Sequence, residues 1–150
     1  MKKVLAVLLA LVMILPVMVA CKKDEKAAAN DVEMKFMSVE DLKEKLGDKE
    51  YTILDVRQKE NRDKGYIEGS IHADMDVVVN GNDTAKGLEI IKKAIEGVDN
   101  NIVLVCNSGK RYAQVATNAL KEAGYDMTKV TTLEGGMKAW DEKFPNETVK

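Results

Sequence analysis

The chain has 150 residues, 45% apolar and 32% charged, which is the balance of one globular domain and excludes a disordered protein. The net charge of −2 leaves no extended basic surface, so nucleic acid is not expected as a partner. Two cysteines and one histidine, with no CxxC or HExxH pattern, give no indication of a metal site, and no cofactor is expected.

The first segment is typical of an exported protein. Lys2 and Lys3 precede an apolar run over residues 4–20, and charged residues follow soon after it. These features describe a secretory signal peptide, so residues 1–20 are predicted to be removed, which shifts the net charge from −2 to −4. An uncleaved anchor helix is the second choice, because Pro16 interrupts a run that is already short for a membrane span.

The end of this segment, Met18-Val19-Ala20-Cys21, resembles the lipobox of bacterial lipoproteins, with Met18 in place of the usual leucine. The resemblance implies a lipid on Cys21 and an exported protein anchored to the extracytoplasmic face of the cell membrane. Lipidation also removes a thiol that is a liability in an oxidising compartment. The alternative is a chance cysteine, and only then is a disulfide between Cys21 and Cys106 expected.

The remaining chain divides into three parts. Residues 21–33 contain the lipidated cysteine and a charged, Ala-rich stretch without apolar periodicity, which predicts a solvated, flexible tether. The folded domain is predicted over residues 34–145 and a short tail over residues 146–150. We find no internal repeat and no second domain in the sequence.

Strand and helix patterns alternate through the domain. The expected elements are a strand at 34–36, a helix between Ser38 and Gly47, a strand at 52–54 ending at Asp55, an extended segment from Ile71, a helix at 88–95, a strand at 102–105, a helix at 110–123, a strand at 130–133 and a helix holding Trp140. This alternation predicts an α/β fold, with about five strands in a central parallel sheet and helices on both faces. Ser38 and Asp41 form a variant capping box.

Cys106 follows the most apolar strand, at the edge of the sheet where α/β proteins place their catalytic groups. The loop after it leads into a helix, whose first N–H groups, dipole and nearby cationic side chains favour an anion and a thiolate. We therefore predict Cys106 as a nucleophile, with the substrate bound by the rest of the loop: Asn107, Ser108, Gly109, Lys110 and Arg111. The loop alone leaves open a second interpretation, an inert core cysteine.

Four strings resemble the successive signatures of the rhodanese domain, in the family's order and spacing. They are Leu54-Asp55-Val56-Arg57, residues 65–71, the Cys106 loop and residues 133–140. The resemblance covers roughly Met34–Phe144 and implies a single rhodanese-like domain with thiosulfate sulfurtransferase activity.

The chain departs from the family pattern in two places. Tyr66 replaces a common histidine, and Asn61-Arg62 replace an acidic–aromatic pair, so the partner of Arg57 is open, with Glu60 the nearest substitute. Asp55 and Arg57 are expected to support the site as a charge pair that fixes loops. The single histidine, His72, is given no catalytic role.

The resemblance also implies a reaction. The Cys106 thiolate would take the outer sulfur of thiosulfate or a persulfide, and the Cys106 persulfide would pass it to a thiol acceptor or cyanide, held meanwhile by loop N–H groups. Related phosphatases and arsenate reductases use a Cys-x5-Arg loop, whereas Cys106 and Arg111 form the shorter Cys-x4-Arg loop. A phosphatase or arsenate reductase is therefore less favoured, and a non-enzymatic sulfane-sulfur carrier or binding lipoprotein is the main alternative.

Overall fold

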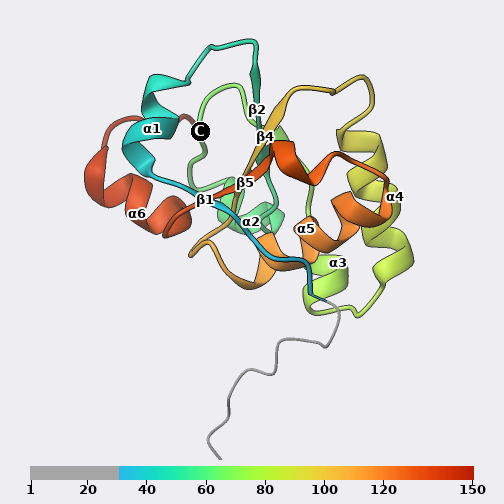
Figure 1. Ribbon diagram of the computed structural model, residues 1–150. Coiled ribbons are helices and arrows are strands. Elements are labelled where there is room, and N and C mark those ends of the chain that lie inside the picture. Colours follow the sequence, from blue (N-terminus) through green and yellow to red (C-terminus); the bar gives the residue numbers. More distant parts are fainter. Residues whose placement is uncertain (1–30) are drawn as a thin grey trace, which may run out of the picture.

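Five parallel strands form the centre of the structure, a computed structural model that describes residues 31–150 (Figure 1). The sheet order is β1-β5-β4-β2-β3, with β4 in the middle, as predicted for the most apolar strand. The strands are β1 (Phe36–Met37), β2 (Tyr51–Asp55), β3 (Ile71–His72), β4 (Asn101–Val105) and β5 (Val130–Leu133). The predicted α/β fold with a five-stranded parallel sheet is therefore confirmed.

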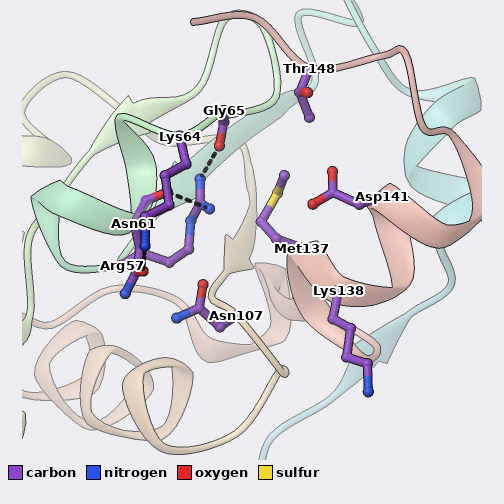
Figure 2. Close-up of a pocket in the computed structure, with 9 residues that line it drawn as sticks. All are labelled: Arg57, Asn61, Lys64, Gly65, Asn107, Met137, Lys138, Asp141 and Thr148. Carbon is purple, nitrogen blue, oxygen red and sulfur yellow. Dashed lines mark hydrogen bonds between the residues drawn. The ribbon is translucent and has the colours of Figure 1, made fainter.

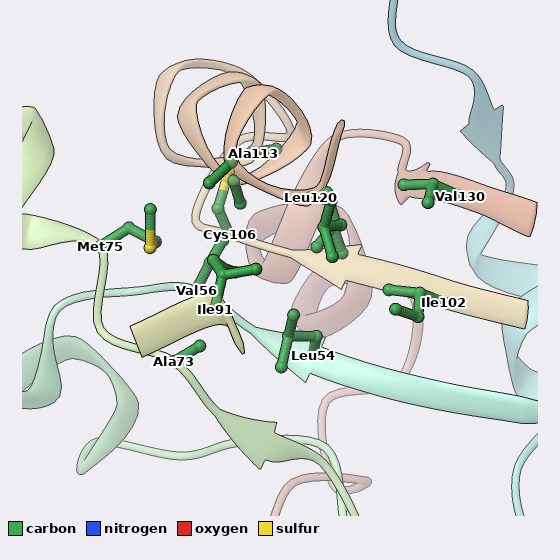
Figure 3. Packing of buried hydrophobic residues seen from close by; sticks show 13 residues of the cluster. Leu54, Val56, Ala73, Met75, Ile91, Ile102, Cys106, Ala113, Leu120 and Val130 are labelled. Atoms are coloured by element: carbon green, nitrogen blue, oxygen red, sulfur yellow. The ribbon is translucent and has the colours of Figure 1, made fainter. Parts of the chain in front are cut away.

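Helices cover both faces of this sheet. They are α1 (Val39–Glu44), α2 (Lys59–Arg62), α3 (Asp76–Val79), α4 (Thr84–Ala94), α5 (Arg111–Glu122) and α6 (Gly136–Lys143), with a 3₁₀ turn, η1 (Met127–Lys129), before β5. Successive side chains of a strand point to opposite faces. Ile102, Leu104 and Cys106 therefore pack with α4 and α5 (Figure 3), whereas Val103 and Val105 pack with α1 and α6.

The ends of three elements show where the sequence predicted the boundaries correctly and where it did not. Ser38 caps α1, since its Oγ accepts the Asp41 N–H at 3.0 Å, as the capping pattern predicts. Helix α4 begins at Thr84, because Asp83 accepts the Lys86 N–H at 2.9 Å, so the predicted start at 88 was too late. The predicted strand at 34–36 was placed too early, since β1 pairs with β5 only at Phe36–Met37.

The two predicted end segments are attached to the domain where the structure describes them. The Val32 N–H donates to Asn118 Oδ1 at 3.0 Å and Gln114 donates to the Val32 carbonyl at 2.8 Å, so the last tether residues already bind α5. At the other end, Tyr66 and Val149 exchange backbone hydrogen bonds of 3.0 and 2.9 Å. The predicted tail is thus fixed beside the turn that precedes β3.

The predicted signal peptide, the lipid attachment at Cys21 and residues 22–30 lie outside the described residues. Within residues 31–150, no helix combines the length and the apolar character that a membrane crossing requires.

Candidate active site

Strand β4 places Cys106 at its carboxyl end, in the alternation that buries Ile102 and Leu104. The residue is 2% exposed, and its Sγ accepts the backbone N–H of Gly109 at 3.1 Å. Gly109 has a φ of +69°, a conformation that glycine adopts without steric cost, and this lets the loop fold back over the sulfur. The loop therefore brings a donor to the thiol, as its sequence predicts.

The beginning of α6 holds the same loop from the other side. The Met137 N–H donates to the Cys106 carbonyl at 2.8 Å, and the Lys138 N–H donates to the Asn107 carbonyl at 3.1 Å. A Cβ on Gly136 would overlap the Cys106 carbonyl oxygen and lie 2.7 Å from the Asn107 carbonyl carbon. Gly136 is thus required because two backbones touch. The sequence analysis included this glycine in a family string but gave it no role in the site.

The other predicted binding residues have different surroundings. The side chains of Asn107, Ser108 and Lys110 lie at the surface, whereas Arg111 donates through Nη2 to the Val79 carbonyl of α3 at 2.7 Å. One N–H group of Arg111 therefore binds α3, a helix that the sequence analysis did not predict.

The next residue of α5 makes a second bond to α3. The Tyr112 hydroxyl donates to Asp76 at 2.6 Å. Burial, and then the bond to Asp76, raises the pKa of Tyr112 to about 12, so the hydroxyl stays protonated and keeps donating. Two neighbouring side chains thus fix α3 against the start of α5, directly after the Cys106 loop.

Asp55 and Arg57 form a buried ion pair at the end of β2. Arg57 donates through Nε to Oδ1 at 2.9 Å and through Nη2 to Oδ2 at 2.6 Å. Arg62 adds a third bond to Oδ2 at 3.2 Å, and Arg57 also donates to the Gly65 carbonyl at 2.8 Å. Asp55 is therefore the partner of Arg57, and the substitute suggested by the sequence, Glu60, is exposed.

The structure gives His72 and Trp140, neither of which was assigned a catalytic role, a place in the fold. His72 Nε2 lies 2.9 Å from the Arg57 carbonyl, and Trp140 is fully buried between the sheet and α1, as predicted for a core residue. The described part of the chain contains no group of three or more His, Cys, Asp or Glu side chains that could hold a metal ion.

A pocket of about 250 Å³ adjoins the loop at Asn107 (Figure 2). Four parts of the chain build it: the end of β2 with α2, the Cys106 loop, α6 and the C-terminal segment. Its lining consists of Arg57, Asn61, Lys64, Gly65, Asn107, Met137, Lys138, Asp141 and Thr148. Cys106 is not among these residues, and the pocket meets the Cys106 loop through Asn107.

The family model for the rhodanese-like domain matches residues 38–143, which is most of the chain. The chain belongs to the rhodanese-like family. Among curated proteins, a candidate sulfurtransferase of Bacillus subtilis, YtwF, is 33% identical over 111 residues, covering 73% of this chain and 93% of YtwF. A candidate sulfur carrier protein of the same organism, YrkF, is 30% identical over 124 residues, covering 81% of this chain and 59% of YrkF.

One solved structure has this fold and a name that refers to a different reaction. The As–Sb reductase of Leishmania major superposes with a TM-score of 0.59 at 22% identity, covering 76% of this chain and 81% of that one. At this identity the likeness concerns the fold alone. The family and its relatives support sulfur transfer as the general chemistry, and the fold by itself does not select a substrate.

Replacing Asp55 by Asn removes the charge between Arg57 and Arg62 and leaves two buried or half-buried cations without a counter-charge. We expect the free energy of unfolding in urea to fall by about 3–5 kcal/mol, the usual cost of breaking a buried pair. Asp63→Asn, which breaks the exposed Lys59–Asp63 pair, should cost no more than about 1 kcal/mol. Equal losses in the two variants would contradict this role for Asp55.

Gly136 and Gly124 both have a positive φ, of +61° and +82°, but only Gly136 lacks room for a Cβ. Gly124→Ala should therefore show backbone strain alone, about 1–2 kcal/mol. Gly136→Ala should lose clearly more stability in urea and also change the rate at which a small alkylating reagent modifies Cys106. If the two variants behave alike, the contact between Gly136 and the Cys106 loop does not hold the site.

Proposed function

We propose that this protein is a sulfurtransferase that carries sulfane sulfur as a persulfide on Cys106. The observation that carries the proposal is the Gly109 N–H directed at Cys106 Sγ, at the end of the central strand of a rhodanese-like domain. A backbone donor fixed in this position stabilises negative charge on sulfur without any rearrangement during the reaction. YtwF, named as a candidate sulfurtransferase, supports the same chemistry.

The proposed reaction has two displacement steps at sulfur. The Cys106 thiolate attacks the outer sulfur of thiosulfate, a Cys106–sulfur bond forms, the sulfur–sulfur bond of thiosulfate breaks, and sulfite leaves with the electron pair. An acceptor thiolate or cyanide then attacks the terminal sulfur of the persulfide, and the Cys106 thiolate is regenerated. Because Cys106 is 2% exposed, this site favours small donors such as thiosulfate or a low-molecular-weight persulfide.

Two alternatives deserve comparison with this proposal. A phosphatase or arsenate reductase needs cationic donors around a bound oxyanion, but Arg111 is turned to the Val79 carbonyl, so it contributes less to such a cradle. A sulfur carrier without turnover has support from the likeness to YrkF, named as a candidate sulfur carrier protein. Carrier and enzyme share the Cys106 persulfide and differ in whether a free acceptor discharges it repeatedly.

We also propose that the protein acts outside the cytoplasm, anchored by a lipid on Cys21. The support is the sequence Met18-Val19-Ala20-Cys21 after an apolar segment with two lysines before it. The sequence has two cysteines, so a lipid on Cys21 would leave Cys106 without an intramolecular disulfide partner.

Incubation of the purified full-length protein with thiosulfate should add the mass of one sulfur atom, detected on the intact protein. Cys106→Ser should show no adduct, because the nucleophilic sulfur is absent. Addition of cyanide should remove the adduct and release thiocyanate over many turnovers. The absence of an adduct on the wild type, or an equal adduct on Cys106→Ser, would overturn the sulfurtransferase proposal, and one turnover only would favour a carrier.

Cys21→Ala should move the protein from the membrane fraction to the soluble fraction of the expressing bacteria, because a single acyl-bearing residue is the proposed anchor. Lys22→Ala, which changes the next residue and keeps the acceptor cysteine, is the control and should remain with the membrane. Membrane retention of Cys21→Ala would instead indicate an uncleaved anchor helix.

A further inference from the structure

The pocket beside the Cys106 loop holds charges of both signs that lack counter-charges within residues 31–150. The Asp141 side chain, on α6, has no ion pair or hydrogen bond in this part of the structure, and the Lys64 ammonium has only a 3.2 Å bond to the amide oxygen of Asn61. Figure 2 shows Lys64 and Asp141 on different walls, with Met137 between them, while Lys138 extends away from the others. Lys64 and Asp141 therefore offer one cation and one anion on different walls, and Lys138 is a further, exposed cation of the lining.

The wall on the Lys64 side is positive beyond this lysine. Arg57 belongs to the buried cluster in which two guanidinium groups, of Arg57 and Arg62, share the single carboxylate of Asp55. This part of the lining thus has a surplus cation in addition to Lys64, which favours a carboxylate there. Asp141 favours an ammonium group on the opposite wall. A zwitterion thus finds a counter-charge on each of these two walls, whereas a dianion such as thiosulfate finds one only on the Lys64 side and leaves Asp141 unpaired.

The size and place of the pocket restrict its ligand further. A volume of about 250 Å³ is below the range of about 300–1,000 Å³ that is usual for drug-sized ligands, so a molecule of amino-acid size suits it. Asn107 belongs to both the pocket and the Cys106 loop, and α6 donates to the Asn107 and Cys106 carbonyls. A ligand bound here is therefore held directly beside the loop that carries the thiol.

We propose that this pocket binds the carboxylate and ammonium groups of a small zwitterionic thiol, with the carboxylate at Lys64 and the ammonium at Asp141, and that this thiol is the sulfur acceptor. The inference rests on the proposed function, since it assumes a Cys106 persulfide. The acceptor thiolate attacks the terminal sulfur of that persulfide, a new sulfur–sulfur bond forms on the acceptor, and Cys106 leaves as a thiolate. No oxidant or reductant is needed.

Four thiols test the contributions of the carboxylate and the ammonium group independently. Cysteine has both groups, cysteamine has only the ammonium, 3-mercaptopropionate has only the carboxylate, and 2-mercaptoethanol has neither. The full-length protein is first loaded with thiosulfate, and the second-order rate of sulfur loss to each thiol is then measured for wild type and variants. The ratio of variant to wild-type rate is taken for each thiol, because intrinsic thiol reactivity cancels in it.

Asp141→Asn should lower this ratio about two- to fivefold for cysteine and cysteamine relative to 2-mercaptoethanol, the size expected for one exposed charge pair. Lys64→Gln should do the same for cysteine and 3-mercaptopropionate. The matched control is Glu142→Gln, which removes the same charge as Asp141→Asn from an exposed position of α6 outside the pocket lining, and it should leave the four ratios equal.

Equal ratios for all four thiols in Asp141→Asn and Lys64→Gln would overturn the pocket assignment. The sulfurtransferase proposal would stand in that case, because the protein would still have formed the persulfide. Failure of the wild type to load would overturn both. A selective effect in Glu142→Gln as large as that in Asp141→Asn would show that general surface charge, and not the pocket, selects the acceptor.

Discussion

The carbonyl groups of Cys106 and Asn107 accept the first N–H groups of α6, and the geometry of the site depends on this contact. It follows from the sheet order, because β4 and β5 are neighbours and the loops that leave their carboxyl ends must meet. The meeting is close enough that Gly109 and Gly136 both lack room for a side chain. The direction of the Gly109 N–H toward Cys106 Sγ is thus set by backbone packing and does not require a side-chain donor.

On the other side of β4, a buried charge cluster at the end of β2 fixes the backbone that follows this strand. Asp55, at the end of β2, orders two arginines, and Arg57 in turn bonds to the carbonyl groups of Asn61 and Gly65. Such a pair gives little net stability once desolvation is considered, but it imposes one arrangement on the turn. The pocket lies between this fixed turn and α6, so both of its walls are held by interactions that do not involve a ligand.

Strands β2 and β4 were predictable from the sequence as continuous apolar runs, and helix α5 from apolar residues at helical spacing. Helix α6 was expected from Gly135-Gly136 and Trp140. Helices α2 and α3 have four residues each, fewer than periodicity can detect, and both hold site residues. The direction of the Arg111 side chain depends on α3, so it could not be predicted from the sequence. The position of Cys106 was predictable, whereas a pocket assembled from four distant segments requires the fold.

The bridge between Tyr66 and Val149 has a practical consequence for handling the protein. It brings the last residues of the chain to the rim of the pocket, where Thr148 faces Gly65. An affinity tag or fluorescent protein fused after Lys150 would therefore emerge next to the pocket. The turn at Gly47, which precedes β2 at the amino edge of the sheet and has open space around it, is the better site for an inserted epitope or label.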